Sequence, residues 1–213
     1  MNKSTLTLFR MGFAYIATVG IQSALAVEQP VTYTGAAVAI GQGEAYTVVQ
    51  VGANGQPSAI GVQFSAALLD GLPQAAAGES PMFSYRLLMP TEGPRTVIDH
   101  VQLDWESLGH PPAQVYDVPH FDFHFYLISA SEQDAVHFHS EHDSGLPQQQ
   151  PPQPLLPPGY MVPPGTAVPK MGVHAIDPGS SEFQGQPFTA TFIYGYYNQR
   201  QIFIEPMVSL AYL

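Results

Sequence analysis

The segment from Pro119 to Leu127 holds the side chains best suited to chemistry, because its polar and apolar residues alternate (Pro-His-Phe-Asp-Phe-His-Phe-Tyr-Leu). Side chains on a β-strand point alternately to the two faces of the sheet. One face therefore carries His120, Asp122, His124 and Tyr126, and the other carries Phe121, Phe123, Phe125 and Leu127. Imidazole nitrogens and carboxylate oxygens are ligands of divalent ions, so the pattern predicts a divalent-metal site, with zinc as the favoured ion.

Strand geometry limits which of these residues can share one ion. Residues two apart on a strand lie about 7 Å apart, whereas the Cα atoms of His120 and His124 would lie about 13 to 14 Å apart. One ion therefore binds Asp122 with one of the two histidines and takes its other ligands from elsewhere. Three further donors are available, each in a distinctive setting: His110 in Gly-His-Pro-Pro, His174 in Met-Gly-Val-His, and Glu205 in Phe-Ile-Glu-Pro-Met. Asp177 is expected to orient the imidazole of His174.

Two other interpretations of the same polar face stay open. Polar and apolar residues also alternate in strands with one face in water. The protein would then be a structural or interaction protein, with the polar face at the interface of a homo-oligomer and Glu205 paired with Arg86 or Arg95. The third interpretation is a metal-free enzyme that uses His, Asp and Tyr126 for acid and base catalysis. The sequence does not decide whether the protein is an enzyme, and it names no substrate.

Two more segments are rich in histidine. His137, His139 and His142 lie just before a Gln/Pro-rich tract, and we interpret them as the composition of an exposed loop rather than a weak metal site. Upstream, alternation places His100, Gln102 and Asp104 opposite Val101, Leu103 and Trp105. We expect Trp105 to face the core and the polar residues to form a lip.

The N-terminus has the features of a secretory signal peptide. Lys3 and Arg10 precede an apolar run, and Ala24-Leu-Ala26 fits the small-x-small pattern of a cleavage site. Residues 1–26 are therefore predicted to be removed, and residues 27–213 to form one domain in the periplasm or outside the cell. No later apolar run is long enough to span a bilayer, so no membrane contact is expected after cleavage.

Charge and motif content narrow the function classes. Beyond the signal peptide, four basic residues stand against 17 acidic ones, which disfavours nucleic-acid binding. The chain has no cysteine, so disulfides and thiol ligands are excluded. A Gly-x-Ser-x-Gly nucleophile motif and a phosphate-binding glycine loop are also missing from the sequence.

Short β-type runs separated by turn residues predict a mostly β, antiparallel barrel or sandwich. The predicted strands are 31–40, 45–51, 60–64, 83–89, 96–105, 120–128, 188–194 and 202–209. Gly52-Ala-Asn-Gly55 is typical of a hairpin turn. Residues 64–72 are the one predicted short helix, with Ser65 as a possible N-cap. Residues 145–170 contain too many prolines for a strand or helix and are predicted to be a long insertion at the surface.

Four motifs together resemble a bacterial family of exported proteins of unknown function. They are Gly-His-Pro-Pro at 109–112, Pro-His-Phe-Asp-Phe-His-Phe-Tyr at 119–126, Met-Gly-Val-His at 171–174 and Phe-Ile-Glu-Pro-Met at 203–207. The family's best-known relative is a sigma-E-controlled homodecameric protein of Thermus. The likeness covers most of residues 27–213, with the Gln/Pro tract outside it. It implies a β-rich domain, export and a ring-like homo-oligomer, and it implies no activity.

Overall fold

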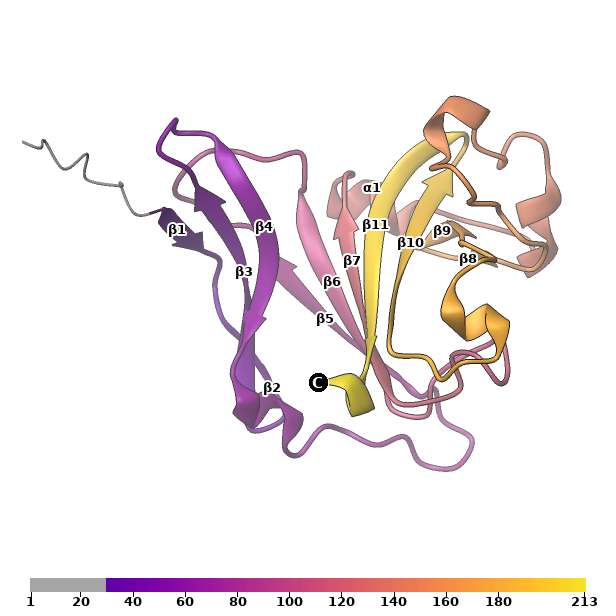
Figure 1. Ribbon diagram of the computed structural model, residues 1–213, viewed down its shortest axis with the longest axis horizontal. Coiled ribbons are helices and arrows are strands. Elements are labelled where there is room, and N and C mark those ends of the chain that lie inside the picture. Colours follow the sequence, from indigo (N-terminus) through magenta and orange to yellow (C-terminus); the bar gives the residue numbers. More distant parts are fainter. Residues whose placement is uncertain (1–29) are drawn as a thin grey trace, which may run out of the picture.

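The computed structural model describes residues 30–213, so the predicted signal peptide lies outside the described residues. Two antiparallel β-sheets face each other (Figure 1). This confirms the mostly β, antiparallel fold predicted from the sequence. In the described part of the chain, no helix has the length and apolar character needed to cross a membrane.

The smaller sheet is built around one long strand. β3 (Gly43–Val51) pairs with β1 (Val31–Thr34), β2 (Val38–Ile40) and β4 (Pro57–Phe64). The predicted hairpin is confirmed, since Gly52–Gly55 joins β3 to β4 and the Gly55 N–H donates to the Gly52 carbonyl at 2.9 Å. The predicted strand 31–40 is divided in two, and Gly35 between its halves donates its N–H to the carbonyl of Thr47.

The larger sheet has seven strands in the order β5-β6-β7-β11-β10-β9-β8 and curls around one face (Figure 1). Its strands are β5 (Met82–Leu88), β6 (His100–Glu106), β7 (His120–Tyr126), β8 (Ala167–Val168), β9 (Gly172–Ala175), β10 (Ala190–Tyr197) and β11 (Arg200–Ser209). The sequence prediction missed β8 and β9, which are too short to show a period of two. β7 lies between β6 and β11, so the metal-ligand motif occupies an inner strand.

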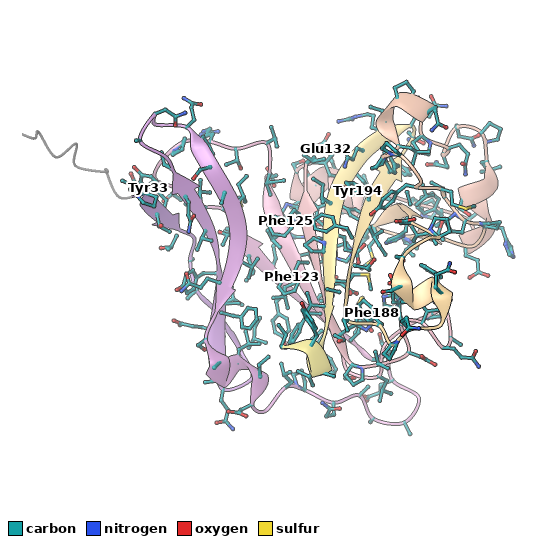
Figure 2. The ribbon with its side chains drawn as sticks, viewed as in Figure 1. Tyr33, Phe123, Phe125, Glu132, Phe188 and Tyr194 are labelled. Atoms are coloured by element: carbon teal, nitrogen blue, oxygen red, sulfur yellow. The ribbon has the colours of Figure 1, made fainter. Side chains whose placement is uncertain are left out.

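The apolar side of β7 forms the core between the sheets. In Figure 2 Phe123 and Phe125 lie in the space between the two sheets. Phe121 packs against Trp105 with ring centroids 4.7 Å apart, and both are buried. Ile40 and Leu68 belong to the same cluster. The expectation that Trp105 faces the core is therefore confirmed.

The polar side of β7 is also buried, which contradicts the interpretation of a wet sheet face. His120, Asp122, His124 and Tyr126 are each at most 3% exposed. Segments that connect the strands of the larger sheet cover this side, and they place Tyr116 and Phe188 in one cluster with Met207 of β11. Figure 2 shows Phe188 beyond β11, on the side away from the smaller sheet. A face closed by its own chain is unavailable as an oligomer interface.

The helical prediction was only partly right. Within the predicted helix 64–72 there is one 3-10 turn, η1 (Ala66–Leu69), and the Ser65 hydroxyl accepts from the Glu44 N–H rather than capping it. The α-helix is α1 (Ala130–Asp134), whose Ser129 and Glu132 form a capping box. Four further 3-10 turns are η2 (Glu141–Gly145), η3 (Gln153–Leu155), η4 (Ser181–Gln184) and η5 (Leu210–Tyr212).

The Gln/Pro-rich segment 145–170 forms turns but is fastened to the sheet. The Gln149 side chain exchanges two hydrogen bonds of 2.9 Å with Asn198 in the turn between β10 and β11. The Tyr196 hydroxyl donates to the Leu155 carbonyl at 2.6 Å. The segment therefore packs onto the larger sheet, and its last residues lie beside the polar face of β7.

The core between the sheets should dominate stability. Replacing Phe121 by Ala removes a buried ring and is expected to lower the free energy of unfolding by about 3 to 5 kcal/mol. Phe192→Ala is the matched control, because Phe192 is 45% exposed on β10, and about 0.5 kcal/mol is expected. Urea denaturation of both variants measures the difference. Equal losses would show that the Phe121 wall is not the main core.

Candidate metal centre

The six residues predicted as metal ligands lie in two groups at the polar face of β7, on the side of the larger sheet that faces away from the smaller sheet. The first group is His110, His120 and Asp122, and the second is His124, His174 and Glu205. In each group, one nitrogen or oxygen atom per residue lies within 4.8 Å of the others. Each group therefore has two imidazoles and one carboxylate that could hold a metal ion. His120 and His124 fall in different groups, as their spacing on the strand requires.

The first group gathers around the carboxylate of Asp122. Asp122 Oδ1 lies 3.2 Å from His120 Nε2, and Asp122 Oδ2 lies 3.4 Å from His110 Nε2. His120 and Asp122 come from β7, and His110 comes from the loop between β6 and β7. Gly109 shapes this loop with a φ of +74°, and a Cβ there would collide with the Tyr116 carbonyl. A glycine at 109 is thus needed to place His110.

The second group gathers around the carboxylate of Glu205. Glu205 Oε1 lies 3.3 Å from His124 Nε2, and Glu205 Oε2 lies 3.9 Å from His174 Nε2. Glu205 is on β11 between β7, which carries His124, and β10. His174 comes from β9, where it lies opposite Gly195 of β10. The registers of three strand pairs, β7–β11, β11–β10 and β10–β9, therefore have to be correct for this group to form.

Three of the four histidines have their second ring nitrogen occupied by a backbone acceptor. His110 Nδ1 donates to the Pro111 carbonyl at 2.6 Å, and His120 Nδ1 donates to the Val118 carbonyl at 2.6 Å. His174 Nδ1 donates to the Thr166 carbonyl at 3.0 Å. A carbonyl oxygen can only accept, so in the neutral form of each ring the lone pair lies on Nε2, which faces the group. Metal-binding histidines in proteins are commonly oriented in this way.

His124 has a carboxylate in the corresponding position. Its Nδ1 lies 3.2 Å from Asp104 Oδ2 of β6, and Gln102 holds Asp104 through bonds of 2.9 and 3.1 Å. The expectation that His100, Gln102 and Asp104 form an exposed lip is wrong for Asp104 and His100, which are both buried. β6 is covered on both faces, and its residues Gln102 and Asp104 form a chain of contacts that ends at His124.

Five buried atoms of these side chains have no hydrogen-bond partner among residues 30–213. They are His120 Nε2, Asp122 Oδ1, His124 Nδ1, His124 Nε2 and Glu205 Oε2. Each of them lies 3.2 to 3.9 Å from a histidine nitrogen or a carboxylate oxygen, but without the geometry of a hydrogen bond. An unpartnered buried polar group costs about 1 to 3 kcal/mol, so this set is unfavourable by itself.

Both groups open onto one pocket of about 740 Å³. His110 and Asp122 line it from the first group, and His124, His174 and Glu205 line it from the second. The end of the Pro-rich segment, from Pro163 to Pro169, forms another wall. The Pro-rich segment therefore contributes to the site, because Thr166 lines the pocket and its carbonyl accepts from His174 Nδ1.

Burial and neighbouring charges shift the pKa values of the histidines and carboxylates in the pocket. Burial lowers the pKa of His110, but the Asp122 carboxylate outweighs it and raises that pKa to about 9. Burial also opposes the charge on His124, whose pKa Glu205 and Asp104 nevertheless raise to about 9. Burial raises the pKa of Glu205 to about 8 and lowers that of His174 to about 4. The raised values for His110 and His124 reflect a negative potential that favours cations.

Glu106 is a site residue that the sequence prediction missed. It is buried, lines the pocket, and lies opposite His120 in the pairing of β6 with β7. Burial, followed by repulsion from Asp122, raises the pKa of Glu106 to about 7. Strand alternation could have found it, since Glu106 is two residues beyond Asp104 and so lies on the same face.

Two predicted contacts are wrong. Asp177 does not orient His174, because its Oδ1 accepts from the Gly179 N–H in a local turn. Glu205 does not pair with an arginine, since Arg86 donates to Gln133 and the closest ionic neighbours of Glu205 are His124 and His174.

The metal-free interpretation loses its proposed acid. The Tyr126 hydroxyl donates to the Lys170 carbonyl at 3.0 Å, and the residue does not line the pocket. Burial, with the charge of Asp104, raises the pKa of Tyr126 far above its usual value. Tyr126 is therefore a structural residue that stacks between His100 and His124.

The three histidines that precede the Gln/Pro-rich tract are at the surface. His137 and His139 have ring centroids 5.3 Å apart, but both are exposed. His142 is also exposed, with Glu141 at 3.8 Å. Within residues 30–213, none of the three belongs to a group of three potential metal ligands.

Comparison with known proteins gives one match. Residues 52–105 match the family model described as TTHB210-like, hypothetical protein TTHB210. No curated protein and no solved structure matches the chain. The matched segment runs from the β3–β4 turn into β6 and ends before His110, the first of the six predicted ligands. The chain therefore resembles the TTHB210-like family of the Thermus protein across β4, β5 and most of β6.

Proposed function

We propose that this protein is an exported β-domain that binds a divalent metal ion. Two histidines and a carboxylate at the polar face of β7 hold the ion. The observation that carries the proposal is the set of five unpartnered atoms on His120, Asp122, His124 and Glu205. A cation in each group would take the lone pairs of its unpartnered imidazole Nε2 and carboxylate oxygen, while His124 Nδ1 would keep its proton beside Asp104. The carbonyl-bound Nδ1 atoms support it further, because they turn three Nε2 atoms toward the groups.

The donor sets favour zinc and an open coordination position. Zinc is bound well by imidazole and carboxylate, and structural zinc sites usually have four protein ligands. A site with three protein ligands keeps one position for water or another molecule, as in zinc enzymes. The same donors also suit iron and manganese. Binding of a divalent ion is the function that we propose, and the reaction at the open position is left unassigned.

Export and self-association complete the proposal. The signal peptide predicted at residues 1–26 supports a location in the periplasm or outside the cell. The resemblance to a family whose best-known relative is a homodecamer supports a homo-oligomer. Its interface would lie elsewhere than the polar face of β7, because the chain itself covers that face.

Metal content tests the proposal directly. Residues 27–213, produced without a His tag and loaded with Zn²⁺, should retain zinc through gel filtration, as measured by elemental analysis. At a free ion concentration 100 times the Kd, binding stabilises the folded state by about 2.7 kcal/mol. For a chain of this size the melting temperature should therefore rise by about 5 to 11 °C. No retained metal together with an unchanged melting temperature would exclude the proposal.

Single variants separate ligands from other histidines. His124→Ala and Glu205→Gln should each weaken zinc retention, since each removes a donor from the second group. His137→Ala is the control, because His137 is an exposed histidine outside both groups. The order of zinc retention should be wild type and His137→Ala first, then the two site variants. Loss of zinc in His137→Ala alone would move the site to the surface.

The chelated protein should become less stable as pH rises from about 6.5 to 9. Folded His110 and His124 keep their protons up to a pKa of about 9, whereas unfolded histidines lose them near 6.5. The folded state then binds more protons than the unfolded state, so its stability falls with rising pH in this window. Glu205, whose pKa is raised to about 8, acts in the same direction.

Zinc should oppose this pH dependence, because the ion needs deprotonated ligands and binds more tightly as pH rises. Thermal melts at several pH values, with EDTA and with Zn²⁺, measure both trends. The difference in melting temperature between the two conditions should widen from pH 6.5 to 9. A difference that narrows would contradict the assignment of His110 and His124 as ligands.

Processing is tested on the secreted protein. Intact-mass measurement of protein collected outside the cytoplasm should give a chain that begins at Val27. Replacing Ala24 and Ala26 with bulky residues should block cleavage, since signal peptidase accepts small residues there. Accumulation of unprocessed wild-type protein in the cytoplasm would overturn the export prediction.

A further inference from the structure

We infer that the pocket takes two divalent ions, one on each group of two histidines and a carboxylate, and that both face a chamber fitting a small carboxylic acid with an apolar body. This inference rests on the proposed metal function and goes beyond it in the number of ions and the class of ligand.

The balance of buried charge favours two ions over one. Four carboxylates are buried around the two groups: Asp104, Glu106, Asp122 and Glu205. Among residues 30–213 the one ion pair made by a lysine or arginine joins Lys170 to Asp134, so no lysine or arginine pairs with these four carboxylates. Two divalent ions carry the positive charge that matches four carboxylates. When the histidines are deprotonated as metal ligands and the four carboxylates are ionised, a single ion would match only half of that charge in a site of low dielectric.

The sheet register places two of these carboxylates directly opposite each other. Asp104 of β6 pairs with Asp122 of β7. Like charges in directly opposed positions destabilise a pair of strands. Asp122 is also next to His110 and His120 of the first group, and Asp104 is next to His124 of the second. A cation on each side would offset the repulsion between the two strands.

One ion cannot serve both groups. His120 and His124 belong to different groups and are four residues apart on β7, which separates their Cα atoms by about 13 to 14 Å. A zinc ion binds its ligand atoms at about 2.0 to 2.2 Å. Two ligand atoms of one ion can therefore be up to about twice that distance apart. The donor atoms of each group lie within 4.8 Å of one another, which is only slightly more. Each group is therefore a complete three-ligand set for its own ion.

The rest of the chamber determines what can reach these ions. Its walls carry Met82, Pro111, Pro112, Ala167, Val168, Ile176, Phe183 and Ile193. Glu106 and Glu141 also line it, and its lining contains neither lysine nor arginine. Without metal, the pocket repels an anion. With metal, the ions supply the positive charge for an oxygen donor, and the apolar walls bind the hydrocarbon part of the same molecule.

Native mass spectrometry with zinc tests the number of ions. Wild-type 27–213 should bind two Zn²⁺ per chain, and His110→Ala and His174→Ala should each bind one. These residues suit the test because they are 31% and 14% exposed and come from a loop and a short strand. His137→Ala should keep two. Circular dichroism checks folding, and His110→Gln and His174→Gln replace any alanine variant that is unfolded.

The number of bound ions distinguishes failure of the proposed metal function from failure of the two-ion pocket. No ion bound to the wild type would overturn both the metal function and this inference. One ion bound would leave the metal function intact and overturn the two-ion pocket. Loss of both ions in a variant of one group would overturn the assignment of one ion to each group.

Calorimetry with acetate, butanoate and hexanoate tests the class of ligand. In the zinc-loaded protein, each added CH₂ should tighten binding about fourfold, so hexanoate should bind about 15 times more tightly than butanoate. None of the three should bind to the chelated protein. Equal affinities along the series, or binding that does not need zinc, would overturn the apolar-acid ligand while leaving the ion count as measured.

Discussion

β7 is buried on both of its faces, and the rest of the structure depends on that constraint. Its phenylalanine side needs the smaller sheet as a cover, and its polar side needs a cover that can also satisfy imidazoles and carboxylates. The loop that carries His110 and the wall formed by the Pro-rich segment meet this second need. Apolar burial on one side stabilises the fold and offsets the cost of closing polar groups under the other.

Alternation within a strand made much of the site predictable. The polar face of β7, the separation of His120 from His124, and the recruitment of His110, His174 and Glu205 all follow from the period of two and from the residue types. The assignment of partners did not follow, because it depends on the register between strands. Asp104 lies behind His124 only because β6 and β7 pair so that Asp104 is opposite Asp122. Register is a tertiary property that one strand's sequence does not encode.

The errors have local physical causes. Residues 64–72 have a helical composition, but β4 extends to Phe64 and leaves only a short turn before Gly71, which has a φ of +70°. The helix α1 was missed although Ser129 and Glu132 form a capping box, because five residues are too few for an apolar period. The Pro-rich segment has the composition of a surface loop, yet the carbonyl of Thr166 is a hydrogen-bond acceptor in the site. Every residue type has a backbone carbonyl, so the sequence could not predict that the carbonyl of Thr166 contacts His174.

The proposed ligands lie between His110 and Glu205 in the sequence. Each group takes its three residues from at least two separate segments of the chain. Contacts of such long separation form late and slowly in a folding chain. An unfolded chain therefore presents no assembled site, and the identity of the ion is decided wherever the sheet closes. For a chain that crosses a membrane unfolded, that place is the receiving compartment. For the export and metal binding that we propose, the free metals of that compartment, rather than the order of intrinsic affinities in the cytosol, would determine which ion is bound.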